Sequence, residues 1–269
     1  MTATTTRIEI TIERQVATVA LNRPSARNAV DDVMRGELMA AFERLATDSA
    51  VRAVVVTGRG PAFCAGGDIA GMQQRLQAPA DEIAFNGWQR QQRTHHLVAA
   101  LHELPKPTIA AVNGAAAGLG CDLALCCDFI IAAASASLIM SYVLRGLIPD
   151  GGGMYFLPRR VGLARAKELI FTGRRIAADE ALQIGMVDRV TRDETLLSDA
   201  QAWATELAQG SAAAIALSKS ILNQTFEATA DQVFGLGSQA QGVCYTTREH
   251  QDAVAAFLNR RDRAKDAPG

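Results

Sequence analysis

The sequence has little excess charge, few aromatic residues and no long apolar run. Lys and Arg number 27 against 28 Asp and Glu, so no basic field favours nucleic acid or an anionic membrane surface. No stretch approaches the roughly 18 uninterrupted apolar residues of a membrane span, and Met1 to Thr6 is polar rather than signal-like. We therefore expect a cytoplasmic protein that binds neither nucleic acid nor membrane.

Cysteine and histidine are also scarce. The 5 cysteines form no C-x-x-C pair, and none has histidines at the spacing of a zinc site, so neither disulfides nor a metal are expected. His95, His96 and His102 fall in a Gln-rich stretch that is typical of a solvated helix face. What the chain has is 49% hydrophobic residues over 269 positions, which is enough for a large core.

The apolar pattern of the first 112 residues predicts strands alternating with helices. Period-two alternation from Arg7 to Leu21 indicates a β-hairpin, and helical spacing follows Asp31 up to about Ala50. Ala53 to Thr57 and Thr108 to Val112 are short continuous apolar runs, as expected of strands covered by helices on both faces. The chain therefore begins as an α/β protein.

The alternation continues to about residue 195. We expect an α/β core over residues 1–195 and a C-terminal helical region over residues 196–269, with no linker between them. Further strands are expected at Phe129 to Ala133, Leu138 to Met140 and Met186 to Val190. Further helices are expected at residues 81–104, 121–127, 151–157, 163–171 and 177–184.

Two glycine-rich turns, Phe63 to Asp68 and Asn113 to Gly120, each follow a predicted strand and precede a predicted helix. Two such turns can aim backbone N–H groups at one point and form an oxyanion hole. The spacing Gly114-x-x-x-Gly118-x-Gly120 also resembles a nicotinamide-binding turn, but that interpretation requires an earlier position in the chain and a Tyr-x-x-x-Lys pair. Enolate chemistry is the better prediction.

Five segments stand in order along the chain: Leu21-Asn22-Arg23-Pro24 with Asn28-Ala29, Ala62 to Asp68, Lys106 to Gly114, Gly146 to Gly152, and Thr172-Gly173. Together they resemble the enoyl-CoA hydratase/isomerase (crotonase) superfamily over nearly the whole chain. The resemblance implies a crotonase-like ββα spiral core followed by the C-terminal helical region.

The same resemblance assigns roles to individual residues. It places the two oxyanion-hole donors on the backbone N–H groups of Gly67 and Leu119, with Gly66 and Gly118 allowing close backbone approach. It implies coenzyme A contacts at Ser25, Ala26, Arg27, Ala65, Asp68 and Ile69, and in the C-terminal region at Phe257, Arg260 and Arg261. For Asp68 a helix cap is the alternative, and for Arg260 and Arg261 a helix C-terminal charge cluster.

The acid and base positions depart from the hydratase pattern, in which the resemblance expects two glutamates. Here the first position is Asp122 and the second is Tyr142, a phenol and a poor base near neutral pH. Asp150 instead occupies a position that dienoyl-CoA and ring-epoxide isomerases of the superfamily use for proton transfer. We expect Asp150 and Asp122 to be catalytic; the alternatives are an N-cap for Asp150 and a solvated helix N-terminal acid for Asp122.

The expected activity is double-bond isomerisation of an unsaturated acyl-CoA. Hydration of a 2-enoyl-CoA is the alternative, and a non-catalytic acyl-CoA-binding protein is a second one. Met140 and Tyr142 are expected in the acyl pocket, where burial would raise the pKa of Asp150. Residues 81–104 would wall that pocket. No cofactor is expected beyond the coenzyme A of the substrate, and the resemblance implies a homotrimer or a dimer of trimers.

Overall fold

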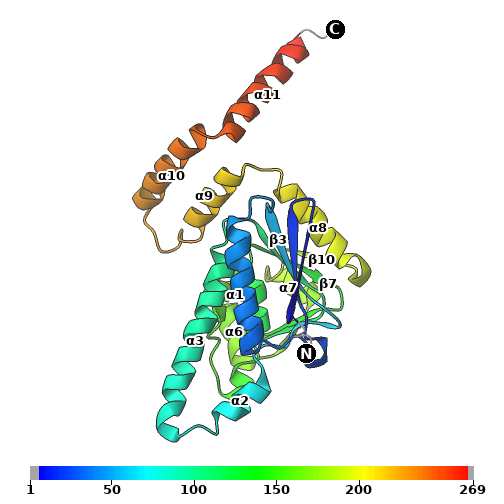
Figure 1. Cartoon of the computed structure of the whole chain (residues 1–269), viewed down its shortest axis with the longest axis vertical. Helices are drawn as coiled ribbons and strands as arrows, with labels where there is room; N and C mark the ends of the chain where they lie inside the picture. Colours follow the sequence, from blue (N-terminus) through cyan, green and yellow to red (C-terminus); the bar gives the residue numbers. More distant parts are fainter. Residues whose placement is uncertain (1–5, 266–269) are drawn as a thin grey trace, which may run out of the picture. The chain divides into compact units, whose positions relative to one another are not determined.

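The computed structural model describes residues 6–265, apart from the side chains of residues 74, 75 and 260–265. Its first part is built on two β-sheets, the larger of which has six strands in the order β1-β2-β3-β5-β7-β10 (Figure 1). The β1 and β2 strands pair antiparallel, and the remaining neighbours pair parallel. The strands are β1 (Ile8–Glu13), β2 (Val16–Leu21), β3 (Ala53–Gly58), β5 (Thr108–Val112), β7 (Phe129–Ala133) and β10 (Arg189–Thr191).

Local sequence explains most of this sheet. The hairpin forms because Arg14 and Gln15 both adopt positive φ, 49° and 66°, as in the two-residue turns that match strand twist. The central strands β2, β3 and β5 are buried almost throughout, as their continuous apolar runs predict. At the far edge, β10 begins three residues later than predicted, because Met186 and Val187 donate backbone hydrogen bonds to Ala181 in a turn.

A smaller sheet of four strands, in the order β4-β6-β8-β9, was not predicted in full. Its strands are only three residues long, and two of them lie inside the glycine-rich segments. They are β4 (Ala62–Cys64), β6 (Ala115–Ala117), β8 (Ser137–Ile139) and β9 (Arg175–Ala177). The parallel pairing of β4 with β6 places the two glycine-rich turns side by side.

The two sheets are connected as a spiral. Consecutive strands alternate between the sheets: β3, β5 and β7 belong to the six-stranded sheet, and the strands that follow them, β4, β6 and β8, belong to the four-stranded sheet. Helices α2 (Ile69–Arg75) and α3 (Ala80–His102) return the chain from β4 to β5, and α4 (Leu119–Leu125) returns it from β6 to β7. This is the α/β spiral that the resemblance predicts.

Helices cover both faces of the six-stranded sheet. Figure 1 shows α8 (Leu196–Leu207) on one side, with α1 (Asp32–Thr47) and α3 on the other. The side chain of Asp31 accepts a hydrogen bond of 2.8 Å from the Met34 N–H and so caps α1, as predicted from the acidic residues there. The remaining helices of this part are α5 (Gly153–Val161), α6 (Leu163–Thr172) and α7 (Ala178–Gln183).

Contacts within the chain divide it into two units, Met1–Leu207 and Ala208–Gly269. Because α8 packs on β2, β3, β5 and β7, it lies with the first unit, whereas the predicted boundary at residue 195 assigned it to the C-terminal region. The second unit contains α9 (Ala212–Leu222), α10 (Ala230–Tyr245) and α11 (Arg248–Lys265). None of the helices within residues 6–265 is both long enough and apolar enough to cross a membrane.

Candidate active site

The two predicted backbone donors lie at the ends of neighbouring strands of the small sheet. Leu119 is the first residue of α4, so its N–H belongs to the helix turn that has no intrahelical acceptor. Gly67 forms a parallel bridge with Val30 that uses the Gly66 carbonyl and the Asp68 N–H. Since successive backbone groups of an extended segment point to opposite sides, the Gly67 N–H faces away from Val30.

Gly66 makes the approach of the two turns possible. Its φ is +100°, which favours glycine, and a Cβ placed on it would lie 2.7 Å from the carbonyl oxygen of Ala117 and 3.5 Å from the Leu119 nitrogen. Gly118 likewise has a positive φ of 53°. The backbone geometry therefore agrees with the predicted close approach at Gly66, whereas at Gly118 only the positive φ favours glycine, since the nearest atom to a Cβ there would be the Ser141 hydroxyl oxygen at 3.4 Å.

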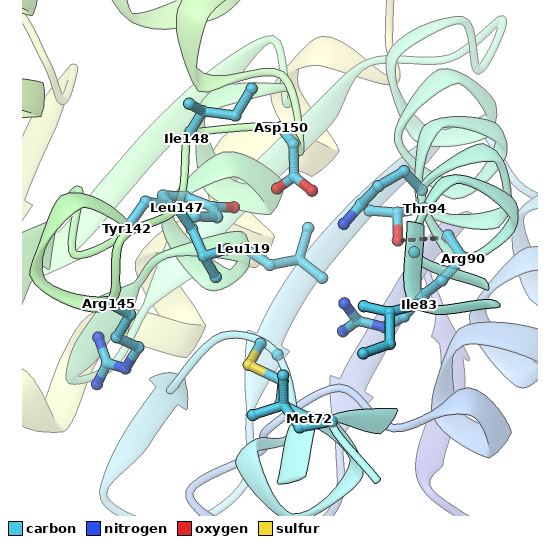
Figure 2. Close-up of a pocket in the computed structure, with 14 residues that line it drawn as sticks. Met72, Ile83, Arg90, Thr94, Leu119, Tyr142, Arg145, Leu147, Ile148 and Asp150 are labelled. Carbon is cyan, nitrogen blue, oxygen red and sulfur yellow. Dashed lines mark hydrogen bonds between the residues drawn. The ribbon is translucent and has the colours of Figure 1, made fainter. Parts of the chain in front are cut away.

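Gly67 and Leu119 line one cavity of about 380 Å³. Figure 2 shows the Asp150 carboxylate near Leu119, with Arg90 and Thr94 on one side and Tyr142 and Leu147 on the other. The remaining described residues that line it are Met72, Leu76, Ile83, Gly87, Gln91, Arg145 and Ile148. The cavity is thus mostly apolar, with the two predicted backbone donors, the carboxylate of Asp150 and the guanidinium groups of Arg90 and Arg145 among its described lining.

Asp150 lies in the loop between η2 (Val143–Arg145) and α5 and is half-buried. Burial raises the pKa of its carboxyl above the ordinary value of 3.8, while its own backbone N–H and the positive charges of Arg90 and His95 oppose the rise. The imidazole of His95 also contacts the Asp150 carbonyl oxygen at 3.0 Å, which ties the loop to α3. The N-cap of α5 is Gly152, so the alternative of Asp150 as the helix cap is wrong.

Asp122 is in a different environment. It is fully buried on α4, and it is not among the described residues that line the cavity, so the alternative of a solvated helix N-terminal acid is wrong. The Tyr142 hydroxyl donates a hydrogen bond to Oδ2 of Asp122, whereas Oδ1 has no hydrogen-bond partner among the described residues. A Cβ on Gly151 or Gly153 would collide with these oxygens, so the glycines let the α5 turn close over the carboxyl group.

The burial of Asp122 changes its protonation. Burial is the largest effect and raises the pKa of Asp122, the hydrogen bond from Tyr142 lowers it, the charge of Asp150 raises it and the backbone of Gly151 lowers it, with a net pKa of about 7. Burial likewise raises the pKa of the Tyr142 hydroxyl well above its usual value of 10, so Tyr142 acts as a hydrogen-bond donor and not as a base.

Of the two residues predicted for the acyl pocket, the structure brings only Tyr142 to the cavity. Met140 is fully buried, and its methyl group lies under Gly153, where a Cβ would meet it. It is not among the described cavity-lining residues. Met140 directly follows the end of β8 at Ile139 and its side chain enters the core, whereas Tyr142, two residues further on, reaches the cavity.

The residues predicted to bind coenzyme A in the first unit form one surface. Ser25 and Ala26 end the short helix η1 (Pro24–Ala26), and the carbonyl of Arg27 accepts a hydrogen bond of 2.9 Å from the Ala65 N–H. Ser25, Arg27, Ala65 and Ile69 are exposed there.

Asp68 has a structural part in this surface. Its carboxylate caps the start of α2 by accepting a hydrogen bond of 2.9 Å from the Ala70 N–H, which is the alternative considered for it. It also pairs with Arg23 at 3.0 Å, and this hydrogen bond, against the effect of burial, lowers the pKa of the Asp68 carboxyl. The ion pair fixes the turn that follows Gly67.

The C-terminal residues predicted to contact coenzyme A are on α11, in the second unit. Phe257 is 62% exposed within the chain. The side chains of Arg260 and Arg261 lie outside the described part of the structure. These assignments stay predictions.

Helix α3 contributes cavity residues that no motif identified. Ile83, Gly87, Arg90 and Thr94 recur at helical spacing and therefore share one face, with Gln91 beside them. The expectation that residues 81–104 wall the pocket thus agrees with the lining of the cavity, but which side chains face it depends on how α3 packs. His95 and His96 are exposed as predicted, whereas His102 is half-buried against Phe156, with ring centroids 4.8 Å apart. Among the described residues, no cluster of three metal-ligating side chains occurs.

Comparisons with known proteins agree with this geometry. A family model described as Enoyl-CoA hydratase/isomerase matches residues 11–266. The chain is 37% identical over 250 residues to the 1,2-epoxyphenylacetyl-CoA isomerase of Escherichia coli strain K12. The match covers 93% of this chain and 94% of that protein. It is also 37% identical over 250 residues to the crotonyl-CoA hydratase of Syntrophomonas wolfei, with coverage of 93% and 94%.

Solved structures are similar over the same length. An enoyl-CoA hydratase from Bacillus anthracis superposes with a TM-score of 0.87 at 31% identity, over 94% of this chain and 96% of that one. An enoyl-CoA hydratase from Polaromonas superposes equally well, with a TM-score of 0.87 at 34% identity, over 94% and 97%. These likenesses confirm the crotonase-like α/β fold. The chain belongs to the enoyl-CoA hydratase/isomerase family.

Proposed function

We propose that this chain is an acyl-CoA isomerase, which moves a double bond by way of an enolate held at the Gly67 and Leu119 N–H groups. The observation that supports the proposal is the position of Asp150, whose carboxylate shares the cavity with both donors. The other acid, Asp122, is buried and accepts a hydrogen bond from Tyr142. One carboxylate can move a proton between two carbons, whereas hydration also requires a water molecule to be oriented.

The proposed reaction starts from a 3-enoyl-CoA whose thioester oxygen accepts hydrogen bonds from Gly67 and Leu119. The Asp150 carboxylate takes a proton from C2, and the electron pair of that bond moves into the dienolate, which places negative charge on the thioester oxygen. Asp150 then returns the proton to C4. The double bond ends between C2 and C3, and no atom is gained or lost. The reaction needs neither a redox cofactor nor a metal ion.

The pKa of Asp150 suits this exchange. A base that accepts a proton and returns it works best when its pKa is closer to the working pH than that of an ordinary carboxyl group. Burial among Leu119, Tyr142 and the other cavity residues raises the pKa of Asp150 in that direction. We expect kcat/KM to fall on the acid side as Asp150 becomes protonated.

Coenzyme A would be held outside the cavity, on the surface formed by Ser25, Ala26, Arg27, Ala65, Asp68 and Ile69. The Arg27 side chain is exposed at this surface and can donate charge-assisted hydrogen bonds to a phosphate. Because Asp68 is already paired with Arg23, its backbone rather than its carboxylate would contact the ligand. In a homotrimer or a dimer of trimers, Phe257, Arg260 and Arg261 would complete the nucleotide pocket; light scattering at several concentrations measures the assembly.

The test compares 3-hexenoyl-CoA with crotonyl-CoA as substrates. We expect the first to gain conjugated-enoyl absorbance and, in deuterated water, to exchange protons at C2 and C4. Asp150→Asn should lower this rate by about 10² to 10⁴-fold, whereas Asp81→Asn, which changes an exposed carboxylate on α3, should have no effect. Unchanged turnover in Asp150→Asn would remove Asp150 from the mechanism.

Hydration is the second candidate function, because one of the relatives at 37% identity is named a crotonyl-CoA hydratase. In that case Asp122, with its pKa of about 7, would be the main acid or base after a shift of the α5 turn. Rapid loss of the crotonyl-CoA absorbance without any double-bond shift in 3-hexenoyl-CoA would favour it. Tight binding of acyl-CoA without proton exchange would indicate a non-catalytic binding protein.

A further inference from the structure

Arg90 is one of two arginines, with Arg145, among the described residues that line this mostly apolar cavity, and the proposed mechanism has not used it. It lies on the face of α3 that lines the cavity together with Ile83, Gly87 and Thr94. Thr94 is buried and donates a hydrogen bond of 3.2 Å to the Arg90 carbonyl, which belongs to the same helix turn. Figure 2 shows the guanidinium group extending from α3 toward Ile83 and Leu119.

The guanidinium group lies close to the predicted oxyanion hole. Its Nη2 atom is 3.1 Å from the position that a Cβ on Gly67 would occupy. Gly67 carries one of the two N–H groups to which the thioester oxygen would bind, so positive charge lies beside the atom on which the enolate charge develops. A charge at a half-buried position acts more strongly than the same charge fully in solvent.

Arg90 also acts on the group that would move the proton. Two cationic residues of α3, Arg90 and His95, oppose the effect of burial on the pKa of Asp150, and the charge of Asp150 in turn raises the pKa values of its acidic neighbours Asp122 and Tyr142. On the α1 side, burial works against ionisation of Asp32, but the hydrogen bond from Arg35 and the charges of Arg35, Arg93 and Arg90 lower the pKa of that carboxyl group. The charge of Arg90 therefore favours ionisation of an acid of α1 and of an acid of the cavity.

We propose that Arg90 is a further residue of the reaction: its guanidinium charge stabilises the enolate oxygen beside Gly67 and keeps Asp150 ionised in the free enzyme. The inference rests on the proposed function, since it concerns the same enolate. Under this proposal the enolate oxygen is stabilised by a fixed positive charge as well as by the two uncharged backbone N–H groups. The residue is suited to this because a guanidinium group stays charged when it is buried.

The test uses three variants of α3. Arg90→Met removes the charge with little change of volume, and Arg90→Lys keeps the charge. Arg93→Met makes the same change at an exposed residue of the same helix that does not line the cavity among the described residues, and so serves as the matched control. The measurements are the rate of double-bond shift in 3-hexenoyl-CoA as a function of pH and the Kd for butyryl-CoA, a saturated analogue.

We expect Arg90→Met to lower kcat by about 10² to 10³-fold on the high-pH plateau, the size of effect seen when one oxyanion-hole donor is removed. The acid limb of its kcat/KM profile should move to higher pH by about 1 unit, because Asp150 loses a neighbouring positive charge. Arg90→Lys should keep kcat within about 10-fold, and Arg93→Met should match the unmodified chain. The Kd for butyryl-CoA should change by less than about 3-fold, because no charge develops on a saturated thioester.

An acid limb and a plateau that both stay unchanged in Arg90→Met would overturn the proposal. So would equal losses in Arg90→Met and Arg90→Lys together with weaker binding of butyryl-CoA, because that result indicates a structural role for the side chain. If the unmodified chain itself neither shifts the double bond nor exchanges the C2 proton, the proposed function fails instead, and the two failures are distinguishable.

Discussion

The buried carboxyl group of Asp122 should make the stability of this protein fall as the pH rises. Its pKa is about 7 in the folded chain against 3.8 for the ordinary group. A carboxyl group whose pKa is raised by folding binds its proton more tightly in the folded state, so the contribution of Asp122 to stability is largest below pH 3.8 and is lost as the pH rises toward 7. The difference of about 3 units corresponds to about 4 kcal/mol between those two limits.

The perturbation that isolates this effect is Asp122→Asn, which keeps the shape of the side chain and removes its ionisation. An amide has its own cost here, since Oδ1 of Asp122 has no hydrogen-bond partner among the described residues and an NH₂ group at that point would lack an acceptor. That cost does not depend on pH. The informative quantity is therefore the difference in unfolding free energy between the variant and the unmodified chain, followed from pH 5 to pH 8.

We expect this difference to shift by about 3 kcal/mol in favour of Asp122→Asn over that range. Urea unfolding at one fixed protein concentration measures it, because any assembly makes stability depend on concentration. Asp81→Asn, at an exposed position, should leave the pH dependence unchanged. A difference that stays constant from pH 5 to pH 8 would refute the reasoning, because Asp122 would then ionise equally well in the folded and unfolded chains.

Three further changes test the same region. Tyr142→Phe removes the hydroxyl that donates to Asp122, so urea unfolding at pH 8 should show a loss of about 1–3 kcal/mol; an unchanged midpoint would contradict the importance of this bond. Gly87→Leu puts a side chain where a Cβ meets nothing within 4 Å, so the fold should tolerate it while KM for 3-decenoyl-CoA rises about 10-fold more than KM for 3-butenoyl-CoA; equal KM changes would place Gly87 outside the acyl path. Gly66→Ala should lower stability by about 1–3 kcal/mol, because φ is +100° and the new Cβ would lie 2.7 Å from the Ala117 oxygen; thermal unfolding measures it, and an unchanged Tm would refute the close approach.

The elements that could be predicted are those whose periodicity is long enough to read. The apolar runs at residues 53–57, 108–112 and 129–133 became β3, β5 and β7 to within one residue. The strands β4, β6 and β9 were missed because three residues show no period, and what defines them is their pairing with distant segments. Local pattern thus predicted the large sheet and missed most of the small one.

The site likewise contains residues that sequence motifs identify and residues that only the packing of helices places. The motifs identified Gly67, Leu119 and Asp150, and the cavity contains all three. They could not show that Asp122 is closed off by Gly151 and Gly153, because this cover comes from a turn about thirty residues later and depends on how α5 packs on α4. Arg90 could not be identified either, since α3 carries no motif and its position is set by its contacts with α1.

The path of the chain between the two sheets divides the cavity into a part held by strand pairing and a wall that contributes no strand. Residues 69–104 leave the small sheet after β4 and rejoin the large sheet before β5, and they supply one wall of the cavity but no strand. The fixed parts, β4 with Gly67 and β6 with Leu119, are held by strand pairing on either side of this excursion. Changes in the stretch from α2 to α3 would therefore alter one wall of the cavity, and with it the position of Arg90, without breaking the strand pairing of β4 with β6.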